Sequence, residues 1–217
     1  MKTLKKGLFI TFEGTEGSGK STQSKMLTSF LRRKGFKVLH IWDPGSTKLG
    51  ESIRKTLLTP GQVISHSSEM LLYMAARAQL VEEKILPALK NNFIVICDRF
   101  IDATVTYQGY GLGVDIKMIE NLNKFVTKSI SPSVTIFLDA NVKKGLKRSR
   151  RVKGFSDRIE RRTYSFHKRV RDGYIALAKR FRNRIKTIPV EENTKDETQS
   201  IIRSIVLDAI KRHKRPK

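Results

Sequence analysis

The sequence predicts an α/β fold, in which a doubly wound parallel sheet of five strands has helices on both faces. Apolar runs of strand length alternate with amphipathic stretches of helix length along the whole chain, and this alternation gives right-handed crossovers between parallel strands. All but the last of the apolar runs are nearly continuous, as expected for strands buried on both faces. No repeat or linker divides the chain, so we expect one domain over residues 1–217.

The predicted elements follow one another in a regular order. Strands are expected at residues 8–13, 37–42, 93–98, 133–139 and 185–190. Helices are expected at residues 20–34, near 68–90 and at 115–128, with two more after residue 141 and one at the end of the chain. Gly35 is placed to end the first helix in a left-handed conformation. Thr194 and Glu197 have the spacing of a capping box before the last helix.

Composition indicates a cytoplasmic protein without a membrane partner. The single cysteine, Cys97, excludes a disulfide framework. No apolar stretch approaches the roughly 20 residues that a membrane span needs, and the run from Leu8 to Phe12 is too short for a signal peptide.

The chain carries a net charge of +24, and residues 143–217 contribute +17 of it, with 25 Lys and Arg against 8 Asp and Glu. Such asymmetry is typical of proteins that bind nucleic acid or clustered phosphates. Solvated basic helix faces explain it better here, because no aromatic side chains that would stack on bases are interleaved with the basic region. We therefore expect no nucleic-acid partner.

Residues 14–21, GTEGSGKS, match the phosphate-loop pattern G-x-x-x-x-G-K-[ST] between an expected strand and an expected helix. Glycines let successive backbone N–H groups turn toward phosphate oxygens, Lys20 reaches the β- and γ-phosphates, and the helix presents its positive end. The predicted ATP site comprises Gly14, Thr15, Glu16, Gly17, Ser18, Gly19, Lys20, Ser21 and Thr22.

A phosphate loop of this kind works with Mg²⁺, which needs an acid at the carboxyl end of a neighbouring strand. The segment FIVICDRF supplies Asp98 at such a strand end, followed directly by Arg99. An isolated Asp at this position is more often a turn former or a helix cap. With Arg99 beside it, the functional interpretation is favoured, and we predict Ser21 and Asp98 as the metal ligands.

Two segments are placed to bind a phosphate acceptor. In the helix near 68–90, Arg77 interrupts the apolar face four residues after Tyr73, and a buried cation without a partner would be costly. This pair predicts a pocket for a nucleobase, although a core Tyr73 with a snorkelling Arg77 is an even alternative for the helix alone. The segment 98–111 gathers further polar groups suited to a nucleoside monophosphate: Arg99, Thr104, Tyr107 and Gln108.

A Gly-containing basic segment, residues 148–162, lies between two expected helices. Alone, such a charge run is usually a solvated face. Opposite a phosphate loop, it favours an arginine-rich lid that closes over ATP and stabilises the charge on the transferred phosphoryl group. The predicted lid arginines are Arg148, Arg150, Arg151 and Arg158.

Together, FEGTEGSGKSTQ, AARAQ and DRF followed by YQG make the chain resemble the bacterial thymidylate kinases over essentially its full length. The resemblance implies a five-stranded sheet in the order 2-3-1-4-5 and a homodimer. It also implies transfer of the γ-phosphoryl group of MgATP to dTMP, giving dTDP for dTTP biosynthesis.

Seven residues are expected from this resemblance to bind dTMP: Glu16, Tyr73, Arg77, Arg99, Thr104, Tyr107 and Gln108. Tyr73 matches an aromatic residue, usually Phe, that stacks on thymine, and Arg77 matches the arginine that binds thymine O4. Arg99 matches an arginine that holds the acceptor phosphate. Tyr107 matches the tyrosine under the deoxyribose, which disfavours a 2′-hydroxyl.

The chain departs from the family pattern at several positions. Trp42 replaces an arginine expected to touch the acceptor phosphate, Asp43 is one methylene shorter than the usual Glu, and Ala103 replaces a common Ser. The lid reads RSRRVKG, with altered arginine spacing. The phosphate loop has Glu16 and no arginine, so we expect the lid to supply the catalytic cation. The expected catalytic residues are then Lys20, Asp98, Arg99 and the lid arginines.

Three other functions remain open from the sequence. The chain could phosphorylate another nucleoside monophosphate, such as AMP, GMP or CMP. Its charge also permits a nucleic-acid-stimulated ATPase, although the chain is small for a motor and has no recognisable aromatic-lined basic groove. The altered segment WDPGST is the one hint of a degenerate kinase that survives as a dimeric binding protein.

Overall fold

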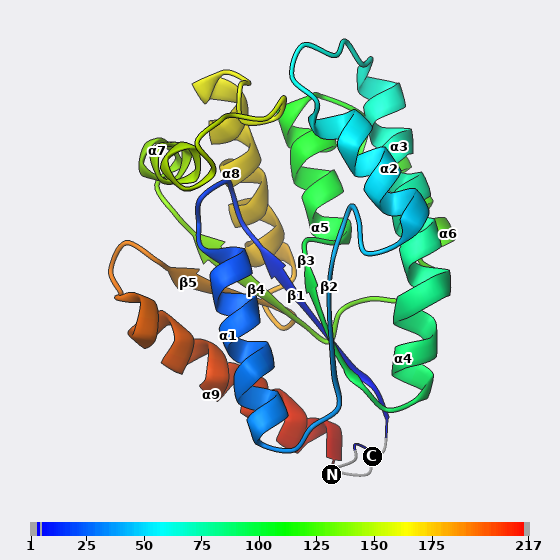
Figure 1. Ribbon diagram of the computed structural model, residues 1–217, viewed down its shortest axis with the longest axis vertical. Coiled ribbons are helices and arrows are strands. Elements are labelled where there is room, and N and C mark those ends of the chain that lie inside the picture. Colours follow the sequence, from blue (N-terminus) through cyan, green and yellow to red (C-terminus); the bar gives the residue numbers. More distant parts are fainter. Residues whose placement is uncertain (1–3, 5, 215–217) are drawn as a thin grey trace.

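The computed structural model describes residue 4 and residues 6–214. Its centre is a five-stranded parallel sheet in the order 2-3-1-4-5 (Figure 1). The strands are β1 (Leu8–Glu13), β2 (Val38–Trp42), β3 (Ile94–Asp98), β4 (Val134–Asp139) and β5 (Ile185–Pro189). The predicted strands and their order are confirmed, each boundary lying within one residue of its expected place.

One face of the sheet is covered by α1 (Lys20–Arg33) and α9 (Lys195–Lys214), which lie side by side in Figure 1. Their apolar residues, including Leu27 and Val206, pack on the inward side chains of the strands. Gly35 has a φ of 86° and ends α1 as predicted. The capping box is also confirmed, because Thr194 N donates to Glu197 Oε2 at 2.7 Å and Glu197 N donates to Thr194 Oγ1 at 3.3 Å.

The opposite face is covered by a second group of helices, which bury two further apolar clusters against the sheet. These helices are α3 (His66–Leu80), the π-helical turn η1 (Val81–Ile85), α4 (Leu86–Lys90), α5 (Ile101–Thr104), the π-helical turn η2 (Val105–Gly111), α6 (Ile116–Val126) and α8 (Tyr164–Arg180). The doubly wound α/β class is therefore confirmed. Among the described residues, we find no helix with the length and apolar character needed to span a bilayer.

The helices differ from the sequence prediction in several places. The helix expected near 68–90 begins earlier, at His66, where the Ser65 hydroxyl accepts a hydrogen bond from Ser68 N. A further helix, α2 (Lys48–Leu58), was not expected, because Gly50 lies in its first turn and lowers the helix propensity. Tertiary packing explains this glycine: a Cβ there would lie 2.9 Å from Gly45 O.

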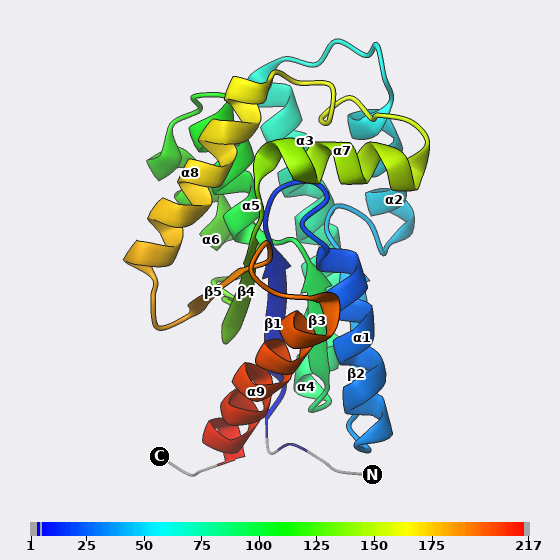
Figure 2. The ribbon, with the colours of Figure 1, turned by 90° about the vertical axis from the view of Figure 1, so that its left-hand side faces the viewer.

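The sheet brings the predicted site residues to one edge. Phe12 pairs with Asp98 and Glu13 pairs with Phe137, so the carboxyl ends of β1, β3 and β4 lie together. The phosphate loop leaves β1 at this edge and enters α1. Helix α7 (Val142–Lys153) follows β4 and lies across the phosphate loop, as Figure 2 shows.

Candidate active site

The phosphate loop has the backbone conformation that its glycines predict. Gly14, Gly17 and Gly19 have φ values of 141°, 66° and 92°, in or near a region that other residues rarely occupy. Lys20 is buried, and its Nζ donates to Thr15 O at 2.7 Å and to Ser18 Oγ at 3.3 Å. Burial and the nearby Arg99 charge lower the pKa of Lys20 to about 7.

The loop is also in very close contact with α7. A Cβ on Gly17 would lie 1.9 Å from Gly145 O, and a Cβ on Gly145 would lie 2.4 Å from Glu16 O. Neither position therefore accepts a side chain without moving the helix. This contact sets the distance between the first turn of α7 and the loop. It therefore also sets the position at which the predicted lid begins.

Glu16 connects the phosphate loop to the acceptor side. Its Oε1 accepts hydrogen bonds from Tyr107 Oη at 2.6 Å and from Arg99 Nη2 at 3.1 Å. Its Oε2 lies 3.2 Å from Nδ1 of the fully buried His167 on α8. Burial alone would raise the pKa of Glu16, but contact with His167 and the charge of Arg99 outweigh it and hold the pKa below its usual value.

Arg99 is held at the centre of the same cluster, and its φ of 66° is unusual for a residue other than glycine. Its Nη1 donates to Gly14 O at 2.9 Å and to Tyr174 Oη at 3.3 Å. Behind it, the buried Glu13 accepts from Tyr174 Oη at 2.7 Å and from Phe100 N at 2.8 Å. Burial and the nearby Asp102 raise the pKa of Glu13 to about 7.

The two predicted metal ligands, Ser21 and Asp98, are close enough to interact. Burial would raise the pKa of Asp98, but the nearby polar groups of His40, Ser24 and Ser21 lower it below its usual value. Asp98 Oδ1 is buried and has no hydrogen-bond partner among the described residues. A buried carboxylate oxygen of this kind beside a serine hydroxyl fits Mg²⁺, which prefers oxygen ligands.

One cavity of about 230 Å³ joins the donor and acceptor sides. Glu16, Lys20 and Ser21 of the donor side line it, and so do acceptor residues from three other elements: Tyr73, Arg77, Arg99, Thr104, Tyr107 and Gln108. The Thr104 hydroxyl is buried without a hydrogen-bond partner in the described part of the chain. The structure thus brings together every residue that the sequence predicted for the acceptor.

Arg77 is fully buried and is held by protein partners rather than snorkelling to solvent. Its Nε donates to Asp43 Oδ2 at 2.6 Å, its Nη1 to Asn123 Oδ1 at 2.7 Å, and its Nη2 to the Phe100 carbonyl at 3.1 Å. Nη1 also donates to Met74 Sδ at 3.9 Å, so one Nη2 hydrogen is left without an acceptor among the described residues. Burial raises the pKa of Asp43, and the Arg77 charge opposes this effect.

Gln108 and Arg158 meet at another buried carboxylate, Glu69 of α3. Gln108 Nε2 donates to Glu69 Oε1 at 2.9 Å, while Arg158 Nη2 and Arg162 Nη2 each lie 2.6 Å from Glu69 Oε2. Arg158 Nε also donates to Leu57 O at 2.7 Å. In this conformation Arg158 ties the end of the predicted lid to α2 and α3 instead of extending over the phosphate loop.

The other predicted lid arginines lie on α7. Arg148 Nη1 donates to Gly17 O at 2.9 Å, so this cation already contacts the phosphate loop. Arg150 and Arg151 are exposed on the same helix. Of the four predicted lid arginines, Arg148 is the one whose hydrogen bond to the loop is seen within the described part of the chain.

The altered segment around Trp42 forms its own hydrogen-bonded turn. Trp42 is 41% exposed, and its Nε1 donates to Glu51 Oε1 at 2.9 Å. Arg54 of α2 lines the cavity and donates to Pro44 O at 3.0 Å. Arg54 is therefore a cation on the acceptor side of this cavity. Ala103 also lines it.

Sequence reasoning missed several residues of the site: Glu13, Arg54, Glu69, Asn123, Gly145 and His167. A glycine inside the basic stretch KKGLK was the one visible signal, because Gly145 interrupts an otherwise regular helix. The others are ordinary polar residues whose partners lie far away in the sequence.

A phosphate loop after the first strand of a parallel 2-3-1-4-5 sheet defines a P-loop nucleotide-binding protein. The family model for thymidylate kinase matches residues 12–201. The chain belongs to the thymidylate kinase family, whose members phosphorylate dTMP to dTDP with ATP.

Individual relatives agree with this assignment. The chain is 48% identical to the thymidylate kinase of Thermoanaerobacter sp. (strain X514), over 82% of this chain and 87% of the relative. It is 46% identical to that of Geotalea daltonii, over 93% and 97% of the two chains. The crystal structure of thymidylate kinase from Ehrlichia chaffeensis superposes with a TM-score of 0.76 at 33% identity, covering 93% of this chain and 99% of that one.

The contact between Gly145 and the phosphate loop predicts the effect of adding one methyl group. Gly145→Ala must move α7 away from Glu16 O. We expect KM for ATP to rise by about tenfold, because the predicted lid is then displaced relative to the phosphate loop. Steady-state kinetics at varied ATP, with circular dichroism to check the fold, measures this. Ser204→Ala, at an exposed position of α9, is the control, and a kinetically normal Gly145→Ala would contradict the assigned role.

Proposed function

We propose that this chain transfers the γ-phosphoryl group of ATP to dTMP within the cavity that contains Lys20 and Arg77. The observation that carries the proposal is that the phosphate loop and all the expected acceptor residues line one cavity. We take residues 1–217 as one catalytic domain and residues 148–162 as its lid. The cavity suits in-line transfer, because donor-side and acceptor-side residues line the same space.

The acceptor base is proposed to stack on Tyr73 and to accept a hydrogen bond from the remaining Nη2 hydrogen of Arg77. Arg99 and Arg54 are proposed to hold the acceptor phosphate. Tyr107, fixed by its 2.6 Å bond to Glu16, would lie beneath the deoxyribose and exclude a 2′-hydroxyl.

An oxygen of the acceptor phosphate attacks the γ-phosphorus as the bond to the β-phosphate oxygen breaks, so ADP leaves. That oxygen is already anionic at neutral pH, and no strong general base is required. Catalysis then consists of positioning and charge neutralisation. Lys20 and Arg148 act on the donor side and Arg99 on the acceptor side, while Arg150, Arg151 and Arg158 become available when the lid closes.

Mg²⁺ is proposed to be held by Ser21 and Asp98, the pair whose chemistry fits it. When bound, the ion neutralises charge on the β- and γ-phosphate oxygens. His40 supports this site, because its Nε2 lies 3.0 Å from Ser24 Oγ and 3.9 Å from Asp98 Oδ1. The remaining residues of the loop bind the donor phosphates through backbone N–H groups.

We also propose that the protein is a cytoplasmic homodimer that does not act on nucleic acid. Support for the dimer is the presence of large exposed apolar side chains on two neighbouring helices, namely Leu71 of α3 and Met118 and Phe125 of α6. Soluble monomers rarely leave such a set uncovered.

A coupled assay of ADP formation tests the proposed function. ATP is supplied with dTMP, dUMP, AMP, GMP, CMP or no acceptor, and we expect dTMP to give the highest kcat/KM. Lys20→Ala should lower turnover by about a thousandfold because it removes a donor-side charge, while the melting temperature stays near that of the wild type. A purine preference would contradict the Arg77 pocket. Hydrolysis stimulated by DNA or RNA and abolished by salt would favour the ATPase instead.

The lowered pKa of Lys20 predicts how ATP affinity depends on pH. Free Lys20 loses its proton above pH 7, whereas the bound phosphates favour its charged form. ATP binding must therefore take up a proton, and affinity should fall by up to about tenfold per pH unit between pH 7.5 and 9. Calorimetry on the wild type and on Lys20→Arg measures this. The ATP affinity of Lys20→Arg should not change with pH over this range. A wild-type affinity that also does not change would contradict the assignment of Lys20 to the ATP phosphates.

A further inference from the structure

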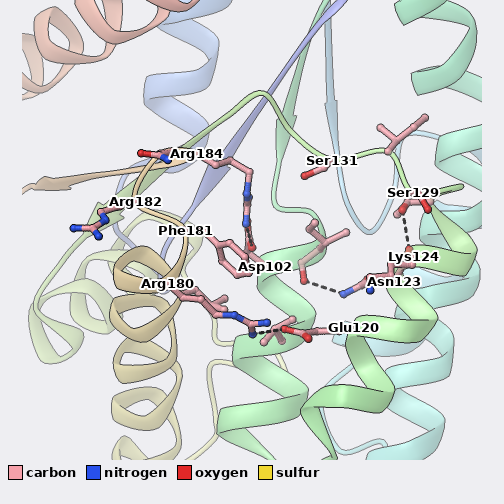
Figure 3. Close-up of a pocket in the computed structure, with 16 residues that line it drawn as sticks. Asp102, Glu120, Asn123, Lys124, Ser129, Ser131, Arg180, Phe181, Arg182 and Arg184 are labelled. Carbon is pink, nitrogen blue, oxygen red and sulfur yellow. Dashed lines mark hydrogen bonds and ion pairs between the residues drawn. The ribbon is translucent and has the colours of Figure 1, made fainter.

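A second cavity, of about 720 Å³, lies away from the phosphate loop. It opens between α6 and the carboxyl end of α8, next to the first residues of β4 and β5 (Figure 3). Its volume is within the range of small-molecule sites. None of the residues assigned above to ATP, dTMP or Mg²⁺ lines it.

The floor of this cavity is apolar and includes an aromatic ring. Ile101, Val105 and Leu177 line it together with Phe181. The guanidinium groups of Arg180 and Arg184 lie 4.8 and 5.2 Å from the centre of the Phe181 ring. Planar cations and an aromatic ring placed in this way form a stacking surface for a flat ligand.

The charged groups of the lining favour an anion. Four cationic side chains line the cavity, against the two carboxylates of Asp102 and Glu120. Both carboxylates are already paired: Asp102 receives two hydrogen bonds from Arg184, at 2.6 and 2.7 Å, and Glu120 receives one from Arg180 at 2.6 Å. These two pairs appear on opposite sides of Phe181 in Figure 3. The lining therefore keeps a positive excess of two charges.

One residue links this cavity to the acceptor pocket. Asn123 lines the cavity, its Nδ2 donates to Ile101 O at 3.3 Å, and its Oδ1 accepts from Arg77 Nη1 at 2.7 Å. Arg77 lines the catalytic cavity. A ligand that shifts Asn123 must therefore change how Arg77 is held.

We propose that this cavity is a second small-molecule site, which binds a flat apolar molecule bearing a negative charge and changes dTMP affinity through Asn123 and Arg77. The binding is independent of the proposed function. The effect on dTMP rests on it, through the assigned role of Arg77.

The test uses two fluorescent probes of nearly the same shape, anilinonaphthalene sulfonate and its uncharged analogue N-phenyl-1-naphthylamine. The full-length protein is first saturated with ADP and dTMP, so that the catalytic cavity is filled. We expect one equivalent of the sulfonate to bind, about tenfold more tightly than the uncharged probe. No saturable binding, or equal affinity for both probes, would overturn the proposal.

Variants locate the bound probe. Ser131 is an exposed residue of the rim, and Ser131→Trp should weaken binding of both probes by about tenfold by filling the cavity. Arg180→Glu should weaken the sulfonate far more than the uncharged probe, because it reverses a charge as well as removing part of the stacking surface. Arg33→Glu is its matched control, since Arg33 is also the exposed last residue of a helix, α1, far from the cavity. Binding that survives both Ser131→Trp and Arg180→Glu would place the probe elsewhere and overturn the site.

Calorimetry then measures dTMP affinity with and without the sulfonate. We expect a change of at least about threefold in the wild type and none in Ser131→Trp. Probe binding with unchanged dTMP affinity would overturn the link through Asn123. Failure of dTMP to bind under any condition would instead contradict the proposed function, so the two failures are distinguishable.

Discussion

The contacts of the largely buried Glu16 carboxylate are the interactions on which the rest of the site depends. It belongs to the phosphate loop, yet its oxygens contact Arg99, Tyr107 and His167 from three other elements. A buried carboxylate is costly unless it is paired and hydrogen-bonded, so these contacts fix one arrangement of the surrounding elements. A single ionised group thus fixes the position of the phosphate loop relative to the acceptor residues.

The position of the proposed lid depends on a second constraint, which is steric. Gly17 and Gly145 let the phosphate loop and α7 approach so closely that no side chain fits between them, and Arg148 then reaches Gly17 O. At the far end of the segment, Arg158 is bound to Glu69. The proposed lid is therefore attached to the donor side at its start and to the acceptor side at its end, which suits the proposed closure over both substrates.

Much of this arrangement could be predicted from the sequence. The five strands and the phosphate loop follow from local patterns of apolar residues and glycines, and the strand order follows from the family resemblance. Glu69, Asn123 and His167 could not be predicted, because each is defined by partners that are distant in the sequence. For the same reason the sequence placed Arg158 over ATP, whereas its guanidinium binds Glu69 and Leu57 O.

The most direct test of the account is a double-mutant cycle between Glu16→Gln and Tyr107→Phe, with kcat/KM for dTMP as the readout. If the Glu16 carboxylate positions the acceptor residues, Glu16→Gln already loses the part of kcat/KM that Tyr107→Phe would remove. The account then predicts an interaction free energy of at least about 1 kcal/mol between the two sites. Effects that add within about 0.3 kcal/mol would mean that Glu16 and Tyr107 act independently, and would contradict the account.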